Sequence, residues 1–146
     1  MGVKLGLDAK LYRNTGTQAA PVWNEIKNVK DVTLNLEAGE ADVTTRGNAG
    51  WRATVATLKD GSIEFDMVWD TADDDFSAIR DTFLNHTAIE FAVMDGDIAT
   101  AGSQGLRATC AVTNFSRNEA LEEAITVSVT VKPTFSANPP TWMTVP

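Results

Sequence analysis

A single histidine and two groups of carboxylates are the side chains in this sequence that could support acid–base catalysis or bind a metal ion. His86 is the only histidine, and it lies in the polar run Leu84-Asn85-His86-Thr87. General acid–base catalysis needs titratable groups that converge on a pocket and have pKa values near neutrality. His86 directly follows a segment that we predict to be helical, where loop polarity or a cation at the negative end of the helix dipole accounts for it. We therefore predict no catalytic residue.

The acidic run at residues 70–75 is the stronger candidate for a metal site, because hard cations such as Ca²⁺ take several carboxylate oxygens. This run, Asp70-Thr71-Ala72-Asp73-Asp74-Asp75, lacks the alternating ligands, the glycine and the terminal glutamate of an EF-hand loop. Aspartates that cap the start of a helix explain it more simply. The second group, Asp95-Gly96-Asp97, fits a tight turn. We predict neither a metal nor a cofactor.

Cys110 is the single cysteine and can form no internal disulfide. It alternates with Leu106, Ala108 and Val112, which places it on an apolar strand face and predicts a buried, inert thiol. The sequence contains no GxxxxGK[ST], GxGxxG, GxSxG or HExxH motif, so it offers no phosphate loop, nucleophile elbow or zinc protease site.

Four tryptophans could instead form a stacking surface for a carbohydrate: Trp23, Trp51, Trp69 and Trp142. Trp69 has the inward parity of its predicted strand, so we expect it in the core. Trp51 and Trp142 border predicted loops and fit either a core or a binding role.

Composition and charge limit the remaining possibilities. A chain of 146 residues with 43% hydrophobic content fits one compact domain over residues 1–146. The net charge of −8 should repel phosphate chains and anionic membranes, so we do not expect the protein to wrap nucleic acid. The N-terminus has no cationic segment followed by an apolar run, and no stretch approaches the roughly 20 apolar residues of a membrane helix. We expect neither a secretory signal peptide nor a membrane span.

Most of the chain alternates apolar and polar side chains with a period of two, which is typical of strands with one buried face. The alternating segments are residues 32–37, 63–69, 89–93, 106–113 and 125–132, and Pro133 ends the last of them. Lys59-Asp60-Gly61-Ser62 predicts a turn that joins a strand at 51–58 to the strand at 63–69 in a hairpin.

One segment has helical spacing instead. Phe76, Ile79, Phe83 and Leu84 fall at i, i+3, i+7 and i+8, and Asp73 to Asp75 stand where aspartates cap a helix start. We predict one short helix over about residues 73–85 that covers one face of the sheet.

Three polar segments fit neither pattern. We predict a loop at residues 14–21, an extended polar loop at about residues 37–50, and an extended, non-helical C-terminal tail at about residues 133–146.

This layout resembles the major tail (tail tube) proteins of long-tailed bacteriophages. The order is a strand, a long loop, a hairpin ending in Trp69-Asp70, one short helix, further strands and a proline-containing tail, and the local runs that carry the resemblance are residues 28–34, 60–65, 75–79 and 114–117. The resemblance covers nearly the whole chain. It implies an antiparallel β-sandwich or half-barrel with one flanking helix. It also implies a non-enzymatic subunit that forms six-membered rings, which stack into a tube for DNA passage.

The resemblance gives two features a role in self-assembly. Unpaired strand edges would pair between neighbouring copies in a closed ring. The segment at residues 37–50 would reach a subunit in the same or the next ring and become ordered on contact. The self-assembly residues predicted there are Glu40, Val43, Arg46 and Trp51, because Arg and Trp commonly carry interface energy. The alternative is a flexible surface hairpin with no partner.

A negatively charged bore would keep DNA from adhering as it slides through. Glu64, Asp66 and Glu90 lie on the polar faces of their strands and are the candidate lumen residues. Ordinary solubility explains the acidic balance equally well. The expected partners are other copies of the chain, other tail proteins and DNA in transit, with no membrane, and the expected location is a virion tail assembled in a bacterial cytoplasm.

Two alternatives stay open. The same fold could form the tube of a contractile injection system or tailocin, where a sheath surrounds it. A β-sandwich module that presents Trp51 or Trp142 to a glycan belongs to another class, and the expected lack of a signal peptide argues against it.

Overall fold

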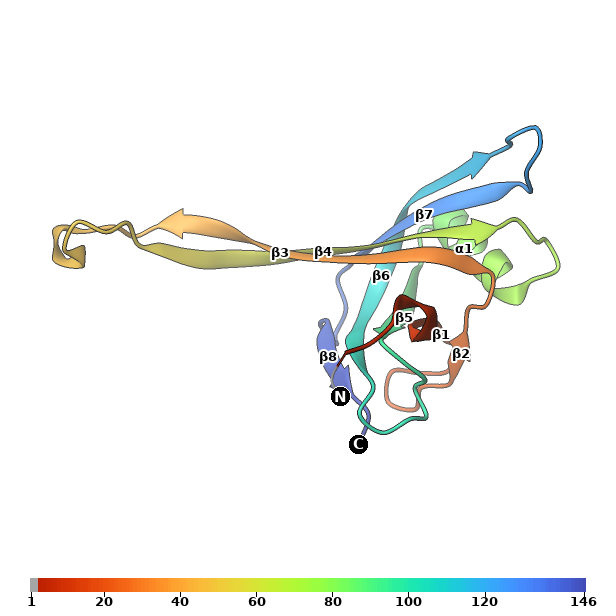
Figure 1. The fold of residues 1–146 in the computed structure, drawn as a ribbon, viewed down its shortest axis with the longest axis horizontal. Helices are drawn as coiled ribbons and strands as arrows, with labels where there is room; N and C mark the ends of the chain where they lie inside the picture. The colour runs from red at the N-terminus through yellow and green to blue at the C-terminus, as the bar shows by residue number, and fades with distance from the viewer. Residues whose placement is uncertain (1–2) are drawn as a thin grey trace.

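The computed structural model describes residues 3–146, which form one twisted antiparallel sheet with one helix packed against it (Figure 1). The strands follow the order β2-β1-β5-β6-β7-β4-β3, and β8 pairs with β6 outside this series. The prediction of a mainly β, antiparallel fold with one short helix is confirmed. The elements are β1 (Lys10–Asn14), β2 (Trp23–Glu25), β3 (Val29–Asp42), β4 (Thr54–Val68), α1 (Asp74–Asn85), β5 (Ala88–Met94), β6 (Gln104–Asn118), β7 (Thr126–Pro133) and β8 (Thr141–Thr144), with single 3-10 turns at Gly6–Asp8 and Arg46–Asn48.

The main core lies on one face of this sheet, which curls around it as a half-barrel, and a smaller cluster of Tyr12, Ala92 and Met94 lies on the opposite face of β1 and β5. A single apolar cluster takes side chains from β1, β3, β4, β5, β6 and β7, which a flat sheet could not bring together. Period-two alternation supplies these side chains, because every second residue of a strand points to the same face. In β4 they are Ile63, Phe65 and Met67, and in β7 they are Val127, Val129 and Val131.

The hairpin predicted around residues 59–62 is wrong. β4 runs without interruption from Thr54 to Val68, and its hairpin partner is β3. Gly61 does not form a turn; its lack of a side chain allows β3 and β4 to approach closely. A Cβ atom at this position would lie 3.1 Å from Cδ2 of Leu36 and 3.3 Å from the carbonyl oxygen of Asn35. The Lys-Asp-Gly-Ser run is a local turn signal that long-range pairing with β3 overrides.

Helix α1 forms where the spacing predicts it. The side chain of Asp73 caps the helix by accepting a hydrogen bond from the backbone N–H of Phe76 at 3.0 Å. Phe76 and Ile79 are fully buried in the core, and the ring of Trp69 stands edge-on to Phe76 with centroids 4.8 Å apart. Leu84 departs from the predicted buried stripe because 64% of it is exposed.

Asp75 fixes the helix to the edge of the sheet, a role beyond the capping that its position in the sequence predicts. Its side chain is 6% exposed. It accepts hydrogen bonds from Nε of Arg13 in β1 at 2.8 Å and from Nδ2 of Asn24 in β2 at 2.9 and 3.0 Å. One carboxylate therefore holds β1 and β2 against α1.

We expect Asp75→Ala to lower the free energy of unfolding by about 3 kcal/mol, because it leaves the half-buried Arg13 guanidinium without a counter-charge. Asp73→Ala, which removes only a helix cap, should cost about 1 kcal/mol. Urea unfolding followed by circular dichroism compares the two variants. A smaller loss for Asp75→Ala than for Asp73→Ala would contradict the anchoring role.

Short strands and a buried thiol complete the fold. The strands β1, β2 and β8 each have five residues or fewer, which is too short for an alternation pattern, and β8 pairs with β6 within the segment predicted to be extended and non-helical. Cys110 is fully buried, and burial raises the pKa of its thiol to about 12.

No helix among the described residues is long and apolar enough to span a membrane.

Candidate assembly surfaces

The outer parts of β3 and β4 form a two-stranded arm, residues 37–59, that projects far from the body of the molecule (Figure 1). β4 pairs with β7 only from Ile63 to Val68, whereas its pairing with β3 extends out to Thr54. Almost every residue of the arm is exposed. A two-stranded hairpin that leaves its sheet buries too little surface to be stable by itself. The arm therefore has the form of an element that a partner molecule completes.

The arm tip, residues 43–53, holds its own shape through local hydrogen bonds. The side chain of Thr45 caps the helical turn Arg46–Asn48. The hydroxyl of Thr44 accepts a hydrogen bond from the backbone N–H of Ala53 at 2.8 Å. The backbone N–H of Thr44 donates to the carboxylate of Asp42 at 2.9 Å, and hydrogen bonds from the Thr44 side chain and backbone lower the pKa of Asp42. The tip is thus a shaped turn before any partner arrives.

The four residues predicted for self-assembly all lie on the arm. Val43, Arg46 and Trp51 lie within the tip, and Glu40 lies in the arm opposite Ala56. Trp51 is 78% exposed, which is unusual for so large an apolar side chain. The expected loop at residues 37–50 is wrong in its first part, because residues 37–42 continue β3 and pair with β4.

Three further apolar side chains of the β3–β4 hairpin are exposed, and sequence patterns did not single them out. Leu58 is 86% exposed, Leu36 at the base of the arm is 57% exposed and Val55 is 50% exposed. Leu58 falls within a register shift opposite the Ala38 to Glu40 segment, where the ladder is interrupted. A local signal existed, since Val55 and Leu58 are three residues apart and cannot share one face of a regular strand.

Glu64 and Asp66 lie on the face of the sheet opposite the core, as their parity predicts. With neighbouring strands they line a shallow depression of about 330 Å³. Ser128 donates a hydrogen bond to Asp66 at 2.8 Å. We call this surface the acidic face, and its polar side chains, all acids or hydroxyls, are Asp31, Thr33, Glu64, Asp66, Ser128 and Thr130.

The third candidate for the lumen, Glu90, is placed differently. Its side chain is 9% exposed and forms a salt bridge with Arg107 at 2.9 Å. Arg107 donates two hydrogen bonds to Glu90, at 2.9 and 3.2 Å, and Asn14 donates a third at 2.6 Å. Arg107 also donates to the carbonyl oxygen of Gln18 at 2.7 Å and lies over the ring of Trp23. The loop after β1 thus closes over Glu90, so this residue is not available to line an open surface of the subunit.

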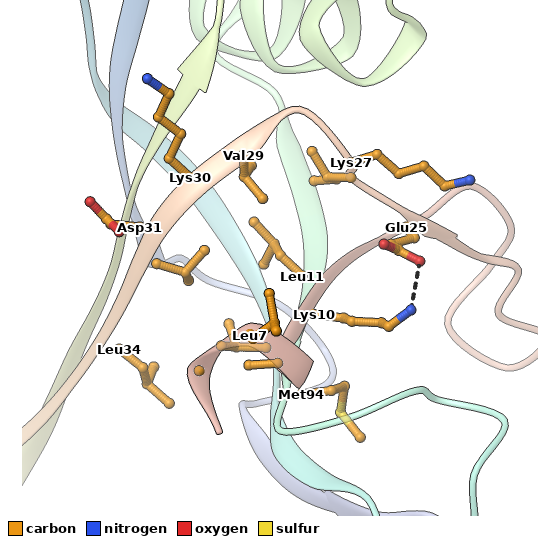
Figure 2. Close-up of a pocket in the computed structure, with 15 residues that line it drawn as sticks. Leu7, Lys10, Leu11, Glu25, Lys27, Val29, Lys30, Asp31, Leu34 and Met94 are labelled. Atoms are coloured by element: carbon orange, nitrogen blue, oxygen red, sulfur yellow. Dashed lines mark hydrogen bonds and ion pairs between the residues drawn. The ribbon is translucent and has the colours of Figure 1, made fainter. Parts of the chain in front are cut away.

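A groove of about 530 Å³ lies where the half-barrel stays open between β1 and β3 (Figure 2). Leu11, Val29 and Leu34 form part of its apolar lining. Nζ of Lys10 lies 3.2 Å from Oε1 of Glu25, and this hydrogen bond raises the pKa of Lys10. The lining thus combines apolar surface with charges at the rim. Within residues 3–146, no group of three or more His, Cys, Asp and Glu side chains is arranged to hold a metal ion.

Solved structures with the same fold include proteins of assembled tails and of a baseplate. The chain matches a protein from the tail of an empty gene transfer agent particle, solved with C6 symmetry, at 16% identity over 99% of this chain and 100% of that one, with a TM-score of 0.74. It matches the SPP1 tail tube at 15% identity over 89% of this chain and 75% of that one, with a TM-score of 0.70. A chain of the anti-feeding prophage baseplate matches at 8% identity over 99% of both chains, with a TM-score of 0.63. At these identities the matches show a shared fold.

Sequence comparison identifies the family. No curated protein matches the chain significantly. The family model described as phage tail tube protein matches residues 7–134, which includes the arm, the acidic face and α1. This match confirms the resemblance and favours it over a carbohydrate-binding module. The chain belongs to the phage tail tube protein family.

Proposed function

We propose that six copies of this chain form a closed ring, that rings stack through the arm, and that the resulting tube is a non-enzymatic conduit for DNA in a virion tail. The observation that carries the proposal is the arm, residues 37–59, which has a shaped tip, exposed apolar side chains and no second strand beside its outer half. The C6 symmetry of the matched gene transfer agent tail motivates the number six.

Ring closure has a physical basis in the two ends of the sheet. β2 and β3 are the terminal strands of the series, and each leaves one row of backbone N–H and C=O groups unpaired. Pairing these edges between neighbours satisfies the groups, and a closed ring leaves no free edge for uncontrolled growth. The groove of Figure 2 lies between these two ends, with residues of β1, β2 and β3 in its lining, and adds apolar surface to such a contact.

The acidic face supports the conduit role. Its exposed groups are carboxylates and hydroxyls, which repel the DNA backbone and release no counterions when DNA passes. Glu64 and Asp66 are the lumen residues that we retain from the sequence analysis. The proposal places the assembled tube in the tail of a virion, with other tail proteins at its ends and with assembly in the bacterial cytoplasm.

Reversing the charge of this face should make the tube adhere to DNA. We expect tubes of Glu64→Lys/Asp66→Lys to retain short duplex DNA about tenfold more strongly than wild-type tubes at low salt. Co-sedimentation of labelled DNA with tubes measures the effect. Asp8→Lys/Asp81→Lys is the matched control, because it makes the same change of net charge at exposed positions outside the acidic face. Equal retention by both variants would show that DNA binding depends on net charge alone. It would contradict the placement of Glu64 and Asp66 in the lumen.

Native mass spectrometry of the purified protein tests the ring. We expect a species of six 15.7-kDa chains and multiples of it. A ladder of other copy numbers would contradict the six-membered ring, and a single monomeric species at all concentrations would contradict the proposed function as a whole.

A further inference from the structure

The arm tip carries a positive charge in a protein that is otherwise strongly acidic. The tip, residues 43–53, contains Arg46 and Arg52 and no aspartate or glutamate, whereas the whole chain has a net charge of −8. Neither arginine forms a salt bridge within residues 3–146, and both are exposed. Trp51, 78% exposed, stands beside Arg52 in the chain. The tip therefore presents two free cations and one large apolar ring.

The turn between β6 and β7, residues 119–124, has the opposite character. It contains Glu119, Glu122 and Glu123, and among them Leu121 is 99% exposed. Arg117 lies 3.6 Å from Glu119 and over the ring of Trp69, and no other salt bridge to this turn is present within residues 3–146. We call residues 119–124 the acidic turn. A fully exposed leucine surrounded by carboxylates gains nothing from its position in the isolated subunit.

The arm tip and the acidic turn lie at opposite ends of the molecule (Figure 1). When identical subunits stack head to tail, the side that bears the arm of one copy faces the opposite side of the next copy. Such an association joins two different surfaces and continues without limit along one axis, so these surfaces must complement each other. The arm tip and the acidic turn complement each other in charge, because arginines can face glutamates. They also complement each other in apolar surface, because a tryptophan ring can cover a leucine.

We propose that the arm tip of one copy docks on the acidic turn of a copy in the next ring, with Arg46 and Arg52 against Glu122 and Glu123 and with Trp51 over Leu121. This inference rests on the proposed function and names the surface that receives the arm. Electrostatic complementarity of this kind chiefly sets which surfaces meet and in which orientation.

Charge reversal tests the pairing. Arg46→Glu/Arg52→Glu makes both ends acidic, and Glu122→Arg/Glu123→Arg makes both ends basic. We expect each variant alone to raise the critical concentration for tube formation by about tenfold or more, because like charges then meet at every junction. An equimolar mixture of the two should form tubes again, since each tip then finds an oppositely charged turn on the other variant. A chain that carries all four changes should also form tubes.

The controls separate this inference from the proposed function. All four positions are exposed, so the melting temperatures of the variants should equal that of the wild type. Lys4→Glu/Arg80→Glu changes the net charge as much as the arm variant does, at exposed or half-exposed positions outside the arm tip and the acidic turn, and it should assemble normally. The pairing would be overturned if the two reversed variants assembled normally, or if neither the mixture nor the fourfold variant formed tubes. Loss of assembly in the Lys4→Glu/Arg80→Glu control would overturn it as well. Failure of the wild type itself to assemble would instead overturn the proposed function.

Discussion

Replacing residues 41–55 with an Asn-Gly turn is expected to yield a folded subunit that no longer forms tubes. Glu40 and Ala56 face each other in register, and Asn-Gly is a favoured two-residue turn between paired strands. The removed residues contribute nothing to the buried core. The free energy of unfolding should therefore change by no more than about 0.5 kcal/mol. Circular dichroism checks the fold, and sedimentation of polymer checks assembly.

A milder change separates the contact at the tip from the length of the arm. Trp51→Ala should cost about 2 kcal/mol per docked tip, which is roughly a thirtyfold rise in critical concentration. Trp142→Ala is the matched control, because Trp142 is also exposed, at 58%, but lies in β8 away from the arm. Full-length tubes from the shortened arm, or equal effects of the two tryptophan changes, would remove the arm from the assembly mechanism.

Val129→Asp should unfold the subunit instead of disabling its assembly. Val129 is 1% exposed and lies between Phe65 of β4 and Phe115 of β6 in register. An unpaired carboxylate there costs about 4 kcal/mol or more, a large share of the roughly 5–15 kcal/mol that stabilises a domain of this size. Urea unfolding should show a large loss of stability or a chain that is unfolded without denaturant.

Lys132→Asp in the same strand is the control for this effect. Lys132 is exposed, so its replacement should change stability by no more than about 0.5 kcal/mol. A native-like melting temperature for Val129→Asp would mean that the centre of β7 is not part of the core. The shortened arm and Val129→Asp thus separate loss of assembly from loss of folding.

Local patterns predict the parts of this fold in which neighbouring residues decide the structure. Period-two alternation marks β5, β6 and β7, and helical spacing with a capping aspartate marks α1. The central error concerns Lys59-Asp60-Gly61-Ser62, which has the composition of a turn but lies inside β4. The decisive contact is the approach of Gly61 to Leu36 and Asn35 across the hairpin, and no local window contains both strands.

The assembly surfaces were predictable to a similar extent. Val43, Arg46 and Trp51 could be placed together because a polar, glycine-containing segment that ends next to a tryptophan predicts a loop tip. Glu90 shows what alternation cannot predict. The alternating pattern predicts on which face of the sheet Glu90 lies, but it does not predict the loop that covers this residue or its salt bridge with Arg107. The hydrogen-bonded ion pair between Asp75 and Arg13 joins residues 62 positions apart in the sequence, so no local pattern predicts it.

Negative-stain electron microscopy of the purified full chain tests the central claim most directly, namely that this subunit acts by polymerising through its own surfaces. We predict rings that stack into hollow tubes whose length grows with protein concentration. Monomeric particles at high concentration, which also fail to add to a tail tip complex, would contradict the claim.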